Sequence, residues 1–190
     1  MSVSRPLHKF TVDEYEQMVE VGILGEDDRV ELILGEIIKM SPIGARHIAC
    51  VRQTNRSCHR QLGDEVFVHI QSPIRLPEHG EPEPDVSLVR PTYNQQHPPL
   101  PQDIHLVIEV SDASLEYDRT QKLPLYAAAG IPEAWLFNLI ANRIERHTEP
   151  GSAGYQTVAF AEPGQRLAST VLPDLDFDAT YLLGLESRGH

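Results

Sequence analysis

Apolar and polar residues recur along the chain with two different periods, and each period predicts one type of secondary structure. A capping box that begins at Thr11 predicts a short amphipathic helix running to about Val21. Apolar and small side chains at helical spacing predict a longer helix over 44–62. A third helix is expected around 123–129, with Pro124 in its first turn, where a missing backbone N–H is tolerated.

Shorter apolar runs bounded by turn residues predict strands. The segment 30–39 is expected to form a hairpin, because two such runs flank Leu34 and Gly35. A helix followed by a strand after the 104–110 run implies a right-handed crossover to a parallel neighbour. The other strands are expected over 65–71, 73–76, 85–89, 134–137, 144–148 and 155–160.

This order of elements predicts an α/β fold, with a mixed central sheet flanked by helices. A length of 190 residues fits one domain spanning the chain. Within it we expect a core over about 44–140, preceded by the N-terminal helix and hairpin over 11–40. Strands over 143–180 would form a C-terminal β extension.

The sequence lacks the features of membrane, secreted and disulfide-bonded proteins, and this predicts the cellular compartment. No apolar run is long enough to span a membrane, and Met1 to Phe10 lack the apolar stretch of a secretory signal. Cys50 and Cys58 fall on one predicted helix, where eight residues separate them by roughly 12 Å, beyond the reach of a disulfide. We therefore expect a reduced, cytoplasmic protein that does not associate with membranes.

The charge pattern limits the function classes. A formal net charge of −12 argues against a protein that coats nucleic acid nonspecifically, since that mode of binding needs a basic face. Arg52, Arg56 and Arg60 form a stripe on the 44–62 helix, for which a solvated helix face is the simpler interpretation. The histidines are scattered and no Cys-x-x-Cys spacing occurs, so any bound metal is expected to have oxygen ligands.

Four polar residues stand in contexts that suit a magnesium site at strand ends: Glu31, Asp85, Glu109 and Lys122. Asp85 follows Pro84 and opens one apolar strand, while Glu109 lies inside another, where burial of an unpaired carboxylate would be costly. Neighbouring strands lie roughly 4.8 Å apart, so one carboxylate from each can ligate the same hard cation. Lys122, at the start of the next predicted helix, offers the positive charge that phosphoryl transfer needs.

Each of these residues also has a simpler interpretation. Asp85 could only cap a turn, Glu109 could point to solvent from a half-exposed sheet, and Lys122 could be a surface lysine. Glu31 could pair with a cation of its own hairpin. Their order and placement favour the joint interpretation, because carboxylates at adjacent strand ends with a nearby lysine suit an ion that activates water at a phosphate.

The same residues carry a resemblance to known proteins. Pro84-Asp85, followed by Ile108-Glu109-Val110 and a nearby lysine, resembles the PD-(D/E)XK nuclease superfamily, whose restriction-endonuclease-like core has the predicted order of elements. The superfamily's lysine usually lies two residues after the glutamate, a position that Ser111 occupies here.

A narrower resemblance covers nearly the whole chain. The segments 31–38, 40–42, 84–86, 107–111, 122–127 and 130–135, together with His47, are similar to the Uma-two family. This restriction-endonuclease-like family is abundant in cyanobacteria and was long classified as a domain of unknown function. The resemblance implies a magnesium-dependent nuclease fold, often dimeric, in which Lys122 replaces the superfamily lysine from the following helix.

We therefore predict a metal-dependent endonuclease that hydrolyses phosphodiester bonds in nucleic acid, with DNA as the expected substrate and a homodimer as the expected assembly. Asp85 and Glu109 would ligate Mg²⁺, for which Mn²⁺ could substitute, with the Val110 carbonyl as a further ligand. Glu31 would complete the acidic shell directly or through water, and Lys122 would orient or activate the attacking water.

Two residues at the start of the arginine-bearing helix, Arg46 and His47, are candidate substrate contacts. A structural histidine with satisfied hydrogen bonds is the alternative for His47. The competing hypothesis for the whole chain is a catalytically inactive nuclease fold that binds protein or nucleic acid. Net acidity favours that hypothesis, whereas retention of all four polar residues disfavours it.

Overall fold

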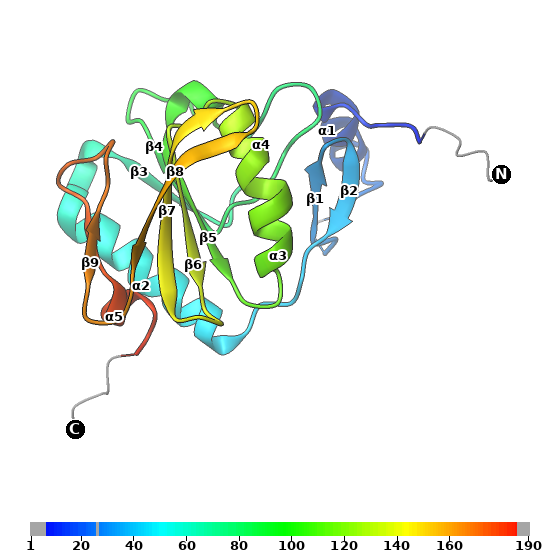
Figure 1. The fold of residues 1–190 in the computed structure, drawn as a ribbon. Helices are drawn as coiled ribbons and strands as arrows, with labels where there is room; N and C mark the ends of the chain where they lie inside the picture. The colour runs from blue at the N-terminus through cyan, green and yellow to red at the C-terminus, as the bar shows by residue number, and fades with distance from the viewer. Residues whose placement is uncertain (1–6, 26, 186–190) are drawn as a thin grey trace.

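A computed structural model describes residues 7–25 and 27–185 of the chain (Figure 1). The prediction that Met1 to Phe10 hold no secretory signal falls partly on residues 1–6, outside the described residues. Among the helices that are described, none has the length and apolar character needed to cross a membrane.

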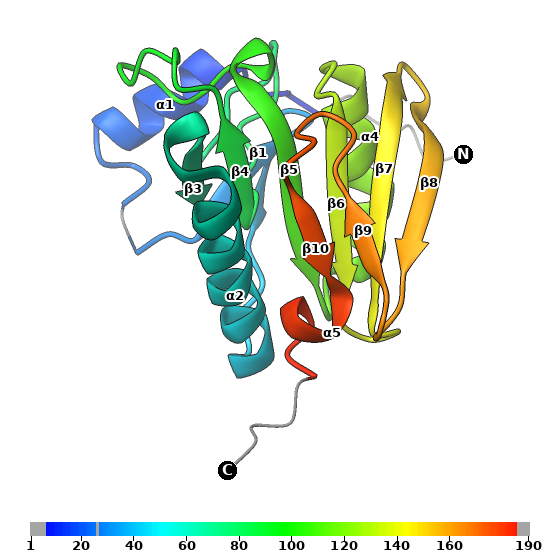
Figure 2. The same cartoon turned by 90° about the vertical axis from the view of Figure 1, so that its left-hand side faces the viewer.

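A six-stranded sheet forms the centre of the molecule (Figure 2). β5 and β6 are parallel, as the helix between them predicted, and the other neighbouring strands of this sheet are antiparallel. The predicted mixed sheet is therefore confirmed. In spatial order its strands are β3 (Phe67–Ile70), β4 (Val86–Val89), β5 (Ile104–Ser111), β6 (Glu133–Asn138), β7 (Arg143–Gly151) and β8 (Gly154–Ala161).

Helices cover both faces of this sheet. α2 (Ala45–Leu62) packs on one face, with Cys50 and Cys58 buried as free thiols against it. A small antiparallel hairpin and a short helix cover the rest of that face, where Phe177 packs edge to face on Trp135. These elements are β9 (Arg166–Ala168), β10 (Asp176–Asp178) and α5 (Ala179–Leu182). Elsewhere in the described chain, 3₁₀ turns lie at Gly63–Glu65 and Pro101–Asp103.

The N-terminal region forms the predicted helix and hairpin. α1 (Val12–Glu20) begins with the capping box, in which Thr11 Oγ1 accepts from the Glu14 amide and the Glu14 carboxylate accepts from the Thr11 amide. β1 (Val30–Ile33) and β2 (Glu36–Lys39) pair across a two-residue turn whose residues both have positive φ, which suits the twist of a hairpin. The hairpin docks on the core by two backbone hydrogen bonds between Leu32 and Glu81.

One predicted strand is wrong. The segment 73–76 makes a single bridge, between Leu76 and Gly80, and belongs to no strand. Its amides donate to carbonyls that include those of Pro82 and Pro99. Because proline has no N–H, these neighbours cannot return the hydrogen bonds of a ladder.

The first two strands from Arg143 onward continue the central sheet, and the next two form the predicted C-terminal β extension. β7 pairs along its length with β6, and β8 forms the edge of the same sheet. The central sheet therefore passes beyond the core limit predicted near residue 140, and the separate C-terminal β element is the β9–β10 hairpin.

The helical segment after β5 begins earlier than predicted. Helical structure starts at Leu115, whereas the sequence predicted a helix only from around residue 123. The segment packs on the face of the sheet opposite α2, through Leu123 and Tyr126. It comprises α3 (Leu115–Tyr117), a π-helical turn (Asp118–Lys122) and α4 (Leu123–Ala128).

Pro124 favours the π-helical turn that precedes it. Proline has no N–H to donate to the residue four positions back, here Thr120, and its ring crowds that carbonyl in a regular α-helix. The wider π-turn, in which the Leu123 amide donates to the Asp118 carbonyl, directly precedes the proline. Pro124 lies in the first turn of α4, as predicted, although helical structure already precedes it.

Candidate active site

A cleft of about 500 Å³ lies at the C-terminal end of β5, between the β1–β2 hairpin, the 40–44 segment and the helix that follows β5. All four residues predicted from the sequence line it: Glu31, Asp85, Glu109 and Lys122. A second hollow, of about 580 Å³, lies between the start of α1 and the 75–79 segment and contains none of the four.

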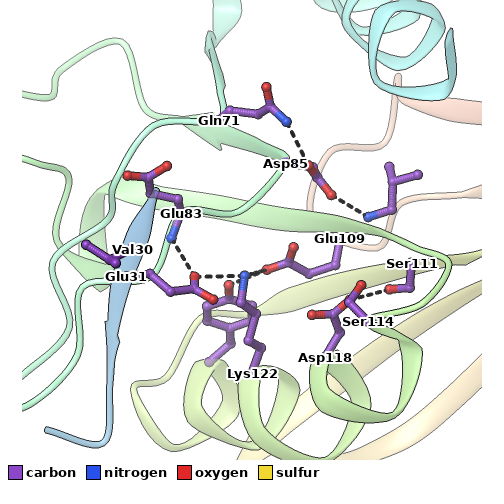
Figure 3. Close-up of polar contacts among 12 residues, drawn as sticks. Val30, Glu31, Gln71, Glu83, Asp85, Glu109, Ser111, Ser114, Asp118 and Lys122 are labelled. Atoms are coloured by element: carbon purple, nitrogen blue, oxygen red, sulfur yellow. Dashed lines mark hydrogen bonds and ion pairs between the residues drawn. The ribbon is translucent and has the colours of Figure 1, made fainter. Parts of the chain in front are cut away.

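Lys122 is buried, and Figure 3 shows its amino group between the carboxylates of Glu31 and Glu109. Its side chain is 6% exposed, and Nζ lies 2.9 Å from Glu31 Oε2 and 3.4 Å from Glu109 Oε1. The surface-lysine alternative is therefore wrong. Burial alone would lower the pKa of Lys122, but attraction to the two carboxylates outweighs it and raises the pKa above its usual range, so the side chain is a fixed cation.

Glu31 reaches this cation from a separate hairpin. Its carboxylate is 4% exposed and also accepts a hydrogen bond from the Glu83 amide at 3.2 Å. The alternative in which Glu31 pairs with a cation of its own hairpin is wrong, because Lys122 is its ionic partner. Docking of the hairpin thus supplies one of the carboxylates that hold Lys122 in place.

Glu109 is buried, so the alternative of a solvent-facing side chain is also wrong. Burial raises the pKa of Glu109 well above its usual range, and the nearby Lys122 cation offsets part of this rise. The hydroxyl of Tyr126 donates to Glu109 Oε1 at 2.5 Å. The carboxylate therefore has two partners, both from the helical segment that follows β5.

Asp85 immediately precedes β4 and connects three elements instead of capping a turn. Its Oδ2 accepts from the Val110 amide at 2.8 Å and lies 2.9 Å from His47 Nε2. Its Oδ1 accepts from the Gln71 side chain at 3.3 Å. Extending the β4–β5 register, in which Val86 faces Ile108, by one residue places Asp85 beside Glu109.

His47 joins the site through Asp85. The contact is made by one ring nitrogen, while Nδ1 is buried and has no hydrogen-bond partner among the described residues. The alternative of a structural histidine with every hydrogen bond satisfied therefore does not describe His47. It lines the cleft from the first turn of α2.

Arg46 points elsewhere. Its guanidinium donates to the carbonyl oxygens of Leu139, at 2.7 Å, and Leu183, at 3.3 Å from Nη2, and it also bonds to the side chain of Asn142. These contacts fasten the start of α2 to the C-terminal part of the chain, and Arg46 is not among the residues that line the cleft. The stripe of Arg52, Arg56 and Arg60 is exposed, as expected for a solvated helix face.

Asp118 and Tyr126 belong to the site but were not predicted. Asp118 is buried and accepts hydrogen bonds from the Ser111 and Ser114 hydroxyls, both at 2.6 Å. Burial raises the pKa of Asp118, while Lys122 and the two hydroxyls act in the opposite direction. The sequence signal for both residues was their four-residue spacing from Lys122, which places side chains on one helix face.

The donor atoms suit a hard cation. The carboxylates of Asp85 and Glu109 and the Val110 carbonyl supply oxygen, as Mg²⁺ prefers, and the cleft holds no thiol. Within residues 7–25 and 27–185, no three His, Cys, Asp or Glu side chains are grouped closely enough to hold an ion by themselves. Magnesium is usually held by one or two carboxylates and keeps several waters or substrate phosphates as ligands.

Comparisons with known proteins give the family and the fold of the chain. A profile of the family described as "Uma2: Putative restriction endonuclease" matches residues 12–180. The fold is similar to the crystal structure of "a putative nuclease belonging to DUF820" from Anabaena variabilis ATCC 29413, with a TM-score of 0.73 and 15% sequence identity over 92% of this chain and 98% of that one. At this identity the likeness concerns the fold alone. No curated protein matches the chain.

Proposed function

The chain belongs to the Uma2 family, and from this membership and the geometry of the cleft we propose that it is a metal-dependent endonuclease acting on nucleic acid, with DNA as its substrate. The observation that carries the proposal is the buried Lys122 cation between Glu31 and Glu109, with Asp85 beside Glu109 at the start of the neighbouring strand β4. The sequence resemblance to this family, and the fold it implied, are confirmed.

The proposed division of labour follows from the contacts. Asp85 and Glu109 would hold Mg²⁺, with the Val110 carbonyl as a further ligand, and Mn²⁺ could replace it. When bound, the cation would lower the pKa of a coordinated water and offset charge on the phosphate. His47 and the Val110 amide both bind Asp85 Oδ2, so they fix the orientation of that carboxylate.

Lys122 would act on the phosphate and the attacking water. Phosphoryl transfer spreads negative charge over the equatorial oxygens, and a cation fixed in a buried site stabilises that charge with little reorganisation. Glu31 keeps Lys122 charged and in place through its 2.9 Å contact. In this proposal Glu31 therefore acts on the site through Lys122, by keeping that side chain in place. The sequence had predicted a different role for Glu31, that of completing the acidic shell around the metal.

A cleavage screen tests the proposal. Wild-type protein is expected to cut at least one of duplex, nicked, branched or single-stranded DNA in the presence of Mg²⁺ or Mn²⁺, and a chelator should abolish the products. RNA substrates of matched sequence test the choice of DNA. Glu109→Gln is the control for contaminating nucleases, because it keeps the shape of the side chain and removes the charge. If wild type and Glu109→Gln give equal products, or neither gives any, the protein is a nuclease fold without turnover.

A further inference from the structure

The segment after β5 aims side chains at the cleft in a regular order. Asp118, Lys122 and Tyr126 are each four residues apart, and all three are buried at or beside the site. In a regular α-helix four residues exceed one turn by roughly 40°, so side chains at this spacing drift around the axis. The π-turn over Asp118–Lys122 holds more residues per turn and offsets that drift.

Tyr126 contacts the site at a single atom. The residue is fully buried, and its hydroxyl donates to Glu109 Oε1 at 2.5 Å. The same oxygen lies 3.4 Å from Lys122 Nζ. Within the described part of the chain no hydrogen bond or ion pair involves Glu109 Oε2. The two donors from one helical segment therefore occupy one carboxylate oxygen and leave the other open.

We propose that Tyr126 is a positioning residue that fixes the Glu109 carboxylate, so that Oε2 stays available to the divalent cation. This inference rests on the proposed function, because it takes Glu109 as a ligand. Its physical reason is that a carboxylate held by an outer hydrogen bond loses little rotamer freedom when an ion binds, and loss of such outer partners typically costs about 10–100-fold in metal affinity.

Tyr155 provides a matched control. Its hydroxyl also donates a hydrogen bond, to the Ile131 carbonyl at 2.9 Å, and its ring packs against the same apolar cluster as Tyr126. Tyr155→Phe therefore removes one tyrosine hydrogen bond from this cluster without touching a carboxylate of the cleft. Both substitutions should cost some stability, which separates a general structural effect from an effect on the cation.

Calorimetric titration of the 190-residue chain with Mn²⁺ alone tests the inference. Tyr126→Phe is expected to raise the Kd for Mn²⁺ by at least about tenfold, whereas the Kd of Tyr155→Phe should stay within about twofold of the wild-type value. Melting curves in chelator show that each variant is folded. Tyr126→Met, which fills the space with a flexible apolar side chain, is the second variant in case Tyr126→Phe does not fold.

The possible results distinguish failure of the positioning role of Tyr126 from failure of the proposed cation site. If wild type binds Mn²⁺ and a folded Tyr126 variant binds it with the same Kd, the positioning role is overturned while the cation site stands. Equal losses in the Tyr126 and Tyr155 variants also overturn it, because the effect would then be structural. If wild type binds no Mn²⁺, the cation site itself fails, and the role of Tyr126 fails with it.

Discussion

Lys122→Met is expected to lower both the melting temperature and the cleavage rate. The variant leaves the buried carboxylates of Glu31 and Glu109 without their shared cation. Removing one partner of a buried ion pair typically costs about 3–5 kcal/mol, and uptake of a proton by Glu109 would reduce this toward the lower figure. For a chain of this size the melting temperature should fall on the order of 10 °C.

The same variant should slow cleavage by about 100-fold or more at a temperature where it is folded, because a fixed charge on the developing phosphoryl oxygens is lost. Lys39→Met is the matched control, since Lys39 lines the same cleft but is exposed. It should melt within about 2 °C of wild type. Unchanged turnover in Lys122→Met, with its substrate Kd also unchanged, would show that Lys122 takes no part in the reaction.

Asp85→Asn is expected to abolish the stabilisation that magnesium gives to wild type. A ligand that binds only the folded state adds about 1.4 kcal/mol at ten times its Kd, which raises the melting temperature by about 3–5 °C. The side-chain amide introduced by this substitution would retain an oxygen for the Val110 amide but lose the charge that attracts the ion. Paired melting curves with Mg²⁺ and with chelator measure the difference.

Asp112→Asn is the control for this measurement. Asp112 is an exposed carboxylate that lines the same cleft, and it makes none of the contacts that Asp85 makes. The control should keep the magnesium shift of wild type. Loss of the shift in both variants would show that the ion responds to the general charge of the cleft. Retention of the shift in Asp85→Asn would show that Asp85 is not a ligand.

Local patterns predicted the elements whose hydrogen bonds are local. The capping box at Thr11, the hairpin turn at Leu34 and Gly35, and the helix that ends before Gly63 all fell where the sequence indicated. The segment 73–76 has the apolar composition of a strand, but its neighbours in space are prolines that come later in the chain. The lack of backbone N–H groups opposite the segment 73–76 depends on the tertiary fold and could not be seen in the local sequence.

The start of the helix after β5 was missed for a related reason. Proline favours the first turn of a helix, so Pro124 indicated a start near residue 123. The chain instead places a π-turn before the proline, and that turn is stabilised by packing against the sheet and by the buried contacts of Lys122. Local propensity does not contain those contacts.

For the site, the sequence identified the charged residues but not the groups that orient them. Glu109 and Lys122 were recognisable because a charge in an apolar or helix-start context needs an explanation. Tyr126 falls inside the predicted 123–129 helix without a charge to mark it, and Asp118 lies before the predicted start of that helix. Their roles depend on the hydroxyl of one and the carboxylate of the other reaching partners across the fold.

A crystal soaked with Mn²⁺ and measured at the manganese absorption edge shows whether Asp85 and Glu109 hold a common cation. An anomalous peak is expected within about 2.0–2.6 Å of a carboxylate oxygen from both residues, the range of hard-cation oxygen ligands. An ion elsewhere in the cleft, or no peak beside Asp85 and Glu109 at millimolar Mn²⁺, would show that these two carboxylates do not form a cation site.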